Sequence, residues 1–217
     1  MARASKAEAI AAMSGDLMRV LADSYAGSSR LVELSRELEN VKSYIAIMKV
    51  RFGKRLDVSF DVEAGAESRL SLRMILQPIV ENCILHGFGG SDERSDGAAA
   101  PGRGRISISA RVDESDLPPA HPPEPRVRVL PGLRLVIEVR DDGSGMDAER
   151  VASVMEDDAE RDGLYRIGVA NVRRRILLNF GDRYGLSIES APAAGTIVRY
   201  VLPVMERVEE EGGRTGA

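Results

Sequence analysis

The chain has 217 residues, a formal net charge of −4 and a sequence isoelectric point near 5.4. An acidic chain with 4% aromatic residues and no Trp lacks the basic face and the stacking rings that nucleic-acid binding needs, which argues against nucleic acid as a partner. One Cys excludes an intrachain disulfide framework and no apolar run approaches the roughly 20 residues of a membrane span, so we expect a cytoplasmic protein.

Apolar periodicity predicts helices and strands in a regular order along the chain. Two stretches interrupt it: residues 87–104 are rich in Gly, Ser and charge, and residues 113–132 hold six prolines, which predicts a loop and an enlarged connection between two strands. The expected helices are 6–22, 29–52, 71–86, 148–156 and 168–179, and the expected strands are 57–62, 105–112, 133–140, 184–190 and 196–202. This order predicts an α/β fold, a two-layer α/β sandwich of a mixed sheet backed by three helices and preceded by N-terminal helices.

The run QPIVENCILHG, residues 77–87, places three polar side chains on one predicted helix. At 3.6 residues per turn, Asn82 and His86 lie one above the other, with Glu81 beside them. A carboxamide oxygen is a hard ligand of the kind that Mg²⁺ accepts, and an imidazole can donate to a phosphate oxygen. The combination indicates nucleotide chemistry. Cys83, on the same helix, is expected to be a small core residue.

The run LRLVIEVRDDGSGMD, residues 133–147, carries a strand-like alternation into Asp141, Gly143 and Gly145. An Asp at a strand end followed by two alternate glycines predicts a sharp turn with room for a flat ligand. A carboxylate only accepts hydrogen bonds, so it suits an exocyclic amine such as that of adenine. Taken alone, this run is more often an ordinary turn.

The run IGVANVRRRILLNFG, residues 167–181, places Gly168 before a helical pattern. A glycine at a helix start lets unpaired backbone N–H groups face an anion, and the helix dipole adds to the attraction. The three arginines that follow, Arg173, Arg174 and Arg175, are expected to form a mostly solvated helix flank.

These three runs, in this order, resemble the N, G1 and G2 boxes of the GHKL ATPases, whose shared ATP-binding architecture is the Bergerat fold. The wording is similar to the QPLVENAIKHG-like N box of the LytS-type sensor histidine kinases. The flanks LSRELENVKSYIAIMKVRFGKRL, residues 34–56, and AGTIVRYVLP, residues 194–203, resemble that family too. The resemblance implies a helical segment at 1–54 like the end of a dimerisation region, an ATP-binding catalytic domain at 55–206 and a flexible tail at 207–217.

The resemblance also implies a role for each matching position. Asn82, helped by Glu81, holds Mg²⁺ against the phosphates of ATP, and His86 lies near the phosphate tail; these three are the expected catalytic residues. Asp141 accepts the adenine amine, and the hydroxyl of Thr196 supports it. The nucleotide-binding set is Asn82, His86, Asp141, Gly143, Gly145, Met146, Arg166, Gly168, Val169, Asn171 and Thr196, with Asn82 and Glu81 as the metal residues.

Three departures from the family pattern change the expectation. The N-P-H-F phosphoacceptor segment is missing, because the only histidines are His86 in the N box and His121 among prolines. In the ATP lid, Leu164 and Arg166 stand where the family has glycines, so Arg166 is expected to contact phosphate as a fixed cation. Pro78 stands where other GHKL families place the residue that activates water, so rapid ATP hydrolysis is not expected.

The expected function is the ATP-binding catalytic core of a two-component sensor histidine kinase, an ATP-dependent phosphotransferase acting on a histidine of a missing segment or another chain. The expected partners are ATP, that histidine-bearing segment and a response regulator, and homodimerisation through the N-terminal helices stays open. The chain would be cytoplasmic, either free or as part of a membrane-anchored sensor. Two alternatives also stay open: a protein-serine kinase of the anti-sigma type, and a nucleotide-sensing module without turnover.

Overall fold

The structure is a computed structural model that describes residues 30–87, 104–155 and 164–208. The predicted helix at 6–22, most of the predicted loop at 87–104 and most of the tail lie outside these residues. No helix in the described ranges is long and apolar enough to cross a membrane. The helices are α2 (Leu34–Phe52), α3 (Ala64–Glu67), α4 (Gln77–Asn82), α5 (Ala148–Met155) and α6 (Leu164–Phe180), with short helical turns η1 (Gly53–Arg55) and η2 (Cys83–Gly87).

Five strands form the main sheet in the order β2-β4-β5-β7-β6. The pair β2 and β4 is parallel and the other pairs are antiparallel, so the sheet is mixed, as the sequence predicts. Two short strands, β1 and β3, pair separately. The strands are β1 (Leu31–Glu33), β2 (Leu56–Val62), β3 (Leu70–Leu72), β4 (Gly104–Glu114), β5 (Val127–Asp141), β6 (Gly185–Ser190) and β7 (Thr196–Arg207).

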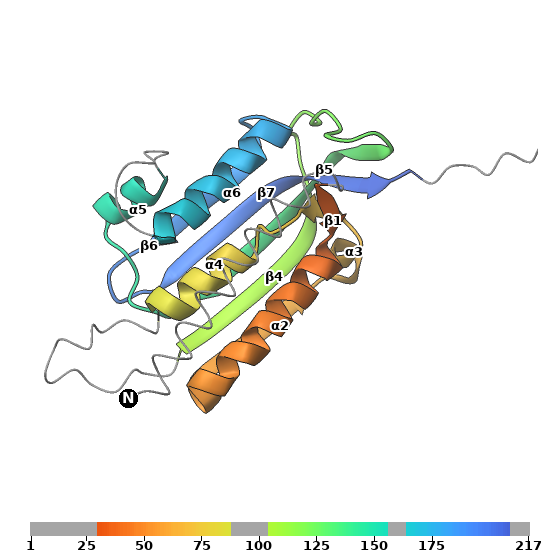
Figure 1. Ribbon diagram of the computed structural model, residues 1–217. Helices are drawn as coiled ribbons and strands as arrows, with labels where there is room; N and C mark the ends of the chain where they lie inside the picture. The colour runs from red at the N-terminus through yellow and green to blue at the C-terminus, as the bar shows by residue number, and fades with distance from the viewer. Residues whose placement is uncertain (1–29, 88–103, 156–163, 209–217) are drawn as a thin grey trace, which may run out of the picture.

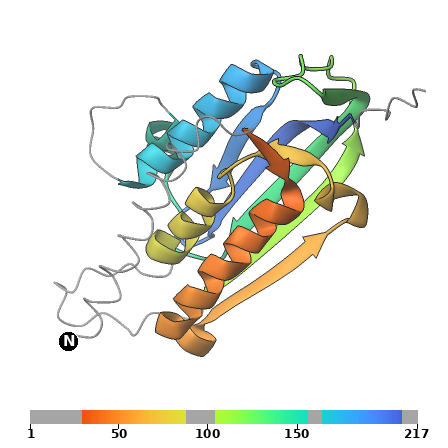
Figure 2. The same ribbon diagram turned by 45° about the vertical axis from the view of Figure 1, so that its right-hand side comes forward.

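Helices α2, α4 and α6 lie side by side across one face of the main sheet (Figure 1, Figure 2). Alternate residues of the strands point to that face and are buried, because successive side chains of a strand point to opposite sides. The fold is therefore the predicted two-layer α/β sandwich with a single core. The central strands contribute Ile106, Ile108, Ala110, Leu135, Ile137, Val139, Val198, Tyr200 and Leu202.

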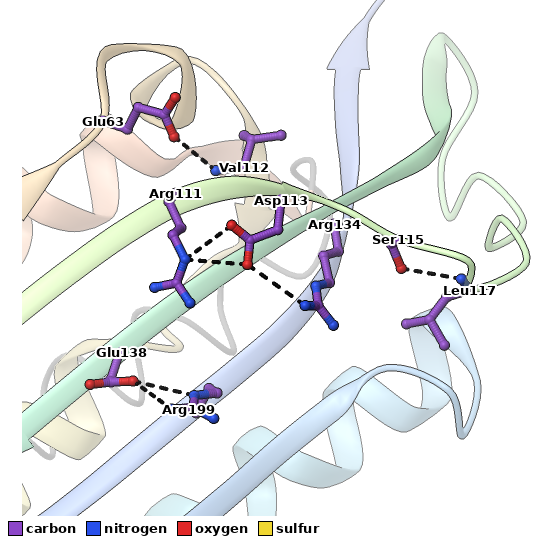
Figure 3. A network of polar contacts seen from close by, with 9 residues as sticks. All are labelled: Glu63, Arg111, Val112, Asp113, Ser115, Leu117, Arg134, Glu138 and Arg199. Atoms are coloured by element: carbon purple, nitrogen blue, oxygen red, sulfur yellow. Dashed lines mark hydrogen bonds and ion pairs between the residues drawn. The ribbon is translucent and has the colours of Figure 1, made fainter.

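The other face of the sheet carries charged side chains on β4, β5 and β7 (Figure 3). Asp113 accepts from Arg111 at 3.0 Å and lies 3.7 Å from Arg134, and Glu138 accepts from Arg199 at 3.0 Å. Each pair is at least partly exposed, so each contributes little to stability. A sheet with one buried and one charged face is what the alternation in the sequence predicts.

The predicted helices at 29–52 and 71–86 are wrong at their starts. Residues 31–33 and 70–72 instead form β1 and β3, which pair with each other, and Leu31 lies opposite Leu72, 41 positions away in the sequence. Met74 has a positive φ of 58°, which a helix cannot accommodate, and α4 begins only at Gln77. The helix then widens into the π-helical turn η2. The pairing of distant strands therefore overrides the local helical pattern.

Three other boundaries also differ from the prediction. Helix α6 begins at Leu164, one turn before Gly168, so the predicted helix start at Gly168 is wrong. Strand β5 begins at Val127 instead of residue 133, because a register shift between Val129 and Arg134 lets the strand pass through its Pro-Gly step. The proline-rich connection therefore shortens to residues 115–126.

Candidate functional site

Asp141 ends strand β5 and is only 5% exposed. Its Oδ1 accepts the backbone N–H of Gly143 at 2.8 Å, and the backbone N–H of Thr196 and the thiol of Cys83 also hydrogen-bond its carboxyl group. Burial nevertheless raises the pKa of this carboxyl above its usual value. A carboxylate has about four acceptor sites, so three protein donors leave room for one more donor from a ligand.

Two glycines let the backbone come close to Asp141. Gly145 has a φ of +63°, and a Cβ there would lie 1.9 Å from the carbonyl oxygen of Ala191. Gly195 has a φ of +77°, and a Cβ there would lie 2.1 Å from the carbonyl oxygen of Asp141. No larger residue fits either position without moving the backbone. The turn after β5 and the loop before β7 therefore pack directly on each other.

Ser190 fastens these two segments together. Its hydroxyl accepts from the backbone N–H of Met146 at 2.9 Å and donates to the carbonyl of Gly195 at 2.8 Å. It also lies 3.0 Å from the hydroxyl of Thr196. Thr196 was expected to support Asp141 through that hydroxyl, but it does so through its backbone N–H, and its hydroxyl contacts Ser190.

Asn82 lies at the last position of α4 and is half-buried. Its Nδ2 is buried and has no hydrogen-bond partner within the described ranges. A Cβ at Gly168 would lie 3.8 Å from this atom and 3.3 Å from Cβ of Pro78, so Gly168 permits the close approach of α6 to α4. Glu81 accepts from Gln77 Nε2 at 2.9 Å on the same helix. An unsatisfied buried amide is costly, so this position fits a polar ligand.

Cys83 joins the two halves of the site. It follows Asn82 directly, and its thiol reaches the carboxyl of Asp141 on the sheet. Burial raises the pKa of this thiol well above its usual value, so it stays a neutral donor. The expectation of a small buried residue is confirmed, and the hydrogen bond to Asp141 is additional. The N-box helix and the Asp141 turn therefore meet at one place.

The remaining predicted residues occupy different environments. Met146 is buried below the Asp141 turn, Val169 is in the hydrophobic core and Asn171 is exposed on α6. The side chains of His86 and Arg166 lie outside the described part of the structure. No group of three His, Cys, Asp or Glu side chains that could hold a metal occurs within residues 30–87, 104–155 and 164–208.

Sequence reasoning missed Ser190 and the contact of Cys83 with Asp141. For Ser190 a signal was present: strands β6 and β7 form a hairpin in which Ser190 lies opposite Thr196, so a correct register would have placed the two hydroxyls together. For Cys83 no local signal exists, because the contact joins two elements 58 positions apart in the sequence.

Two family models match the sequence. One, described as histidine kinase-, DNA gyrase B- and HSP90-like ATPase, matches residues 67–206, and one described as histidine kinase matches residues 1–56. Among known proteins, the putative uncharacterized protein YwpD of Bacillus subtilis is 29% identical over 182 residues, covering 84% of this chain and 54% of that protein. The sensor protein LytS of Enterococcus faecalis is 26% identical over 178 residues, covering 82% of this chain and 26% of that protein.

Among solved structures, the mycobacterial sensor histidine kinase MprB is similar with a TM-score of 0.49 and 14% identity, covering 83% of this chain and 100% of that chain. The chain spans between a quarter and about half the length of the two curated relatives above. The first family model covers well over half of the chain, and the resemblance to LytS-type kinases is confirmed. The chain therefore belongs to the family of histidine kinase-, DNA gyrase B- and HSP90-like ATPases and carries the ATP-binding catalytic core of a histidine kinase.

Proposed function

We propose that this chain binds Mg²⁺-ATP and transfers the γ-phosphoryl group to a histidine on another segment or another chain, from which it passes to a response regulator. The observation that carries the proposal is Asp141, a buried carboxylate with acceptor capacity left for one donor, in direct contact with the helix that presents Asn82. The acidic composition and the match to the ATPase family agree with a nucleotide as the ligand.

In this proposal the adenine amine donates to Asp141, and the turn that contains Gly143, Gly145 and Met146 forms the wall below the base. A hydrogen-bond acceptor at this position matches the amine of adenine. It does not match guanine, whose corresponding group is a carbonyl oxygen and therefore also an acceptor. The closed backbone packing around the two glycines keeps the turn rigid, so the carboxylate is held ready before the ligand arrives. Adenine recognition therefore needs no movement of the sheet.

Mg²⁺ would be held by Asn82 with help from Glu81. The unpartnered atom of Asn82 is the donor Nδ2, which fits an acceptor such as a phosphate oxygen, and the amide Oδ1 is the atom that would bind Mg²⁺. Mg²⁺ in phosphotransferases needs only one or two protein groups because the phosphates supply the others. Bound there, the ion would neutralise phosphate charge. Gly168, Val169 and Asn171 of α6, together with His86 and Arg166, stay the predicted residues on the phosphate side. Phosphoryl transfer depends mainly on such positioning and charge neutralisation, so no nucleophile from this chain is needed.

The division into a helical segment at 1–54, a catalytic domain at 55–206 and a tail at 207–217 belongs to the same proposal, supported by separate family models at 1–56 and 67–206. The match of residues 1–56 to a histidine kinase model favours this assignment over a protein-serine kinase of the anti-sigma type. A cytoplasmic location, where ATP and response regulators occur, and homodimerisation through the N-terminal segment complete the proposal.

The test combines binding and transfer. Calorimetry is expected to show ATP binding that Mg²⁺ strengthens and that GTP does not reproduce, and Asn82→Ala should weaken the Mg²⁺ complex more than free ATP. Radiolabelled ATP should then label a histidine-bearing partner, with an acid-labile bond typical of phosphohistidine. Binding without any transfer would favour the nucleotide-sensing module. Absence of ATP binding would refute both.

A further inference from the structure

The loop of residues 73–76 joins β3 to α4 and therefore fixes where the N-box helix begins. Its backbone is unusual, since Met74 has a positive φ of 58° without being Gly. Such a conformation is unfavourable for a residue other than Gly and persists only where the surroundings impose it. Side chains from three different elements, α2, α6 and β7, bind the peptide groups of this loop.

Glu37 of α2 holds the N–H groups. Its two carboxylate oxygens accept from Met74 N at 2.8 Å, Ile75 N at 3.0 Å and Leu76 N at 3.4 Å. The side chain is only 1% exposed. These N–H groups precede α4, where the positive end of the helix dipole also favours a negative charge. A buried carboxylate is therefore used here to bind the backbone of another element.

Arg175 of α6 holds the carbonyl groups of the same loop from the other side. Its guanidinium donates to the carbonyl of Arg73 at 2.6 Å and to that of Met74 at 3.3 Å. The hydroxyl of Tyr200 on β7 donates to the carbonyl of Ile75 at 2.8 Å. The expectation that all three arginines of this helix are mostly solvated is therefore wrong for Arg175, which is half-buried.

The two charges also interact with each other, because Arg175 lies close enough to Glu37 to favour its ionised form. The loop is thus the middle layer between a buried carboxylate and a guanidinium. Removing either charge leaves the other facing peptide groups of the loop without its counterpart. Buried charges that lose a partner are strongly unfavourable, so the loop would rearrange in response.

We propose that Glu37 and Arg175 are positioning residues of the ATP site, which fix α4 and so hold Asn82 where it meets the ligand. This rests on the proposed function of Asn82. Two facts connect these two residues, called the clamp from here on, to the site. Helix α4 is only six residues long and runs from the loop held by the clamp to Asn82, its last residue, and the helix that carries Arg175 also places Gly168 against Pro78. Both α2 and α6 therefore determine the position of Asn82.

The expected effect is mainly on the phosphate side of the site. Two of the three donors to Asp141, the N–H groups of Gly143 and Thr196, lie outside α4, and only the thiol of Cys83 links Asp141 to that helix. If the clamp is loosened so that α4 is correctly placed in about one molecule in ten, the apparent affinity for Mg²⁺-ATP falls about tenfold. Adenosine, which lacks phosphates and tests the Asp141 half, should bind as before. A general loss of structure would weaken both ligands alike.

The experiment compares matched variants by calorimetry below their melting temperatures. Glu37→Gln is paired with Glu39→Gln, an exposed carboxylate on the same helix, and Arg175→Gln is paired with the exposed Arg174→Gln. Both clamp variants should bind Mg²⁺-ATP about tenfold more weakly while adenosine binding is retained, and both controls should bind both ligands like the parent. Arg175→Gln provides an independent arm if Glu37→Gln does not fold.

Each other outcome has a defined meaning. If the parent binds Mg²⁺-ATP and the clamp variants bind it equally well, or lose adenosine to the same extent, the positioning role is overturned while the proposed function stands. If the parent binds no nucleotide, the proposed function fails and the positioning role with it. Hydrogen exchange at Ile75 and Leu76 supplies the direct structural readout, since their protection should fall in the clamp variants only.

Discussion

At the scale of single residues, the carboxyl of Asp141 shows how a buried charge can be tolerated for recognition. Burial favours the neutral acid, while the N–H groups of Gly143 and Thr196 and the thiol of Cys83 favour the carboxylate. The net effect is a raised pKa. All three neighbouring groups donate hydrogen bonds, so the carboxyl acts only as an acceptor. A ligand that brings a further N–H adds to this pattern without disturbing it.

We expect Asp141→Asn to lose most of the affinity for ATP. The amide replaces one acceptor oxygen with an NH₂ group, which would face the N–H of Gly143, the N–H of Thr196 or the adenine amine. An unmatched polar contact of this kind costs about 1–3 kcal/mol, or roughly a tenfold to hundredfold rise in Kd by calorimetry. Asp142→Asn is the matched control, because Asp142 is exposed and accepts from Arg105 N at 2.6 Å instead. Unchanged ATP binding by the Asp141 variant would remove it from adenine recognition.

At the scale of elements, the sequence predicts what is local and misses what is distant. The alternation that ends at Asp141 is local, and both the strand and its terminal carboxylate were predicted. The start of α4 depends on β1 pairing with β3 and on Glu37 binding the loop, and neither partner is near in the sequence. The helical period continues through residues 71–76, so only these tertiary contacts end it. The same reason applies to Arg175: the resemblance marks it as an arginine that the family also carries, but the carbonyl groups that it binds lie 101 and 102 positions away in the sequence.

Two glycines in turns, one at the site and one after the end of α6, give a prediction that separates backbone strain from steric exclusion. Gly195 and Gly181 both have positive φ, at +77° and +81°, but only Gly195 has a neighbour within reach of a Cβ. Gly181→Ala should therefore cost only the left-handed conformation, about 1–2 kcal/mol of unfolding free energy. Gly195→Ala adds a collision with the backbone of Asp141 and should cost about 1–3 kcal/mol more, as well as weakening ATP binding. Urea unfolding measures both, and equal losses in the two variants would contradict the close approach.

At the scale of the whole molecule, the helical layer and the sheet share a single core, and the carboxyls of Glu37 and Asp141 are buried in or beside it. Helix α2 belongs to this core, since Leu34, Leu38 and Val41 pack with the residues of the sheet. The protonation of the two buried carboxyls therefore changes the free energy of unfolding of the whole molecule. The exposed ion pairs on the face of the sheet shown in Figure 3 contribute little to it. This difference predicts how stability depends on pH.

Burial raises the pKa values of Glu37 and Asp141 above the ordinary values of 4.5 and 3.8 that unfolding restores. Between the ordinary and the folded pKa, the folded protein binds more protons than the unfolded chain, so the contribution of these groups to stability falls as pH rises through that window. Glu206 acts in the opposite direction: hydrogen bonding to Arg128 lowers its pKa, so its contribution is present above its ordinary pKa of 4.5 and is lost as pH falls through the lowered pKa.

Acidification from neutral pH towards the ordinary carboxyl range, about pH 4 to 5, should therefore raise the contribution of Glu37 to the unfolding free energy before the loss at Glu206 begins. Glu37→Gln removes one titrating group, so the difference in stability between the parent and this variant should shift in favour of the parent as the pH falls through this range. The exposed Glu39→Gln should show no such shift. Urea unfolding at a series of pH values measures the difference, and parallel curves for the parent and Glu37→Gln would show that the carboxyl in the clamp titrates as it does in the unfolded chain.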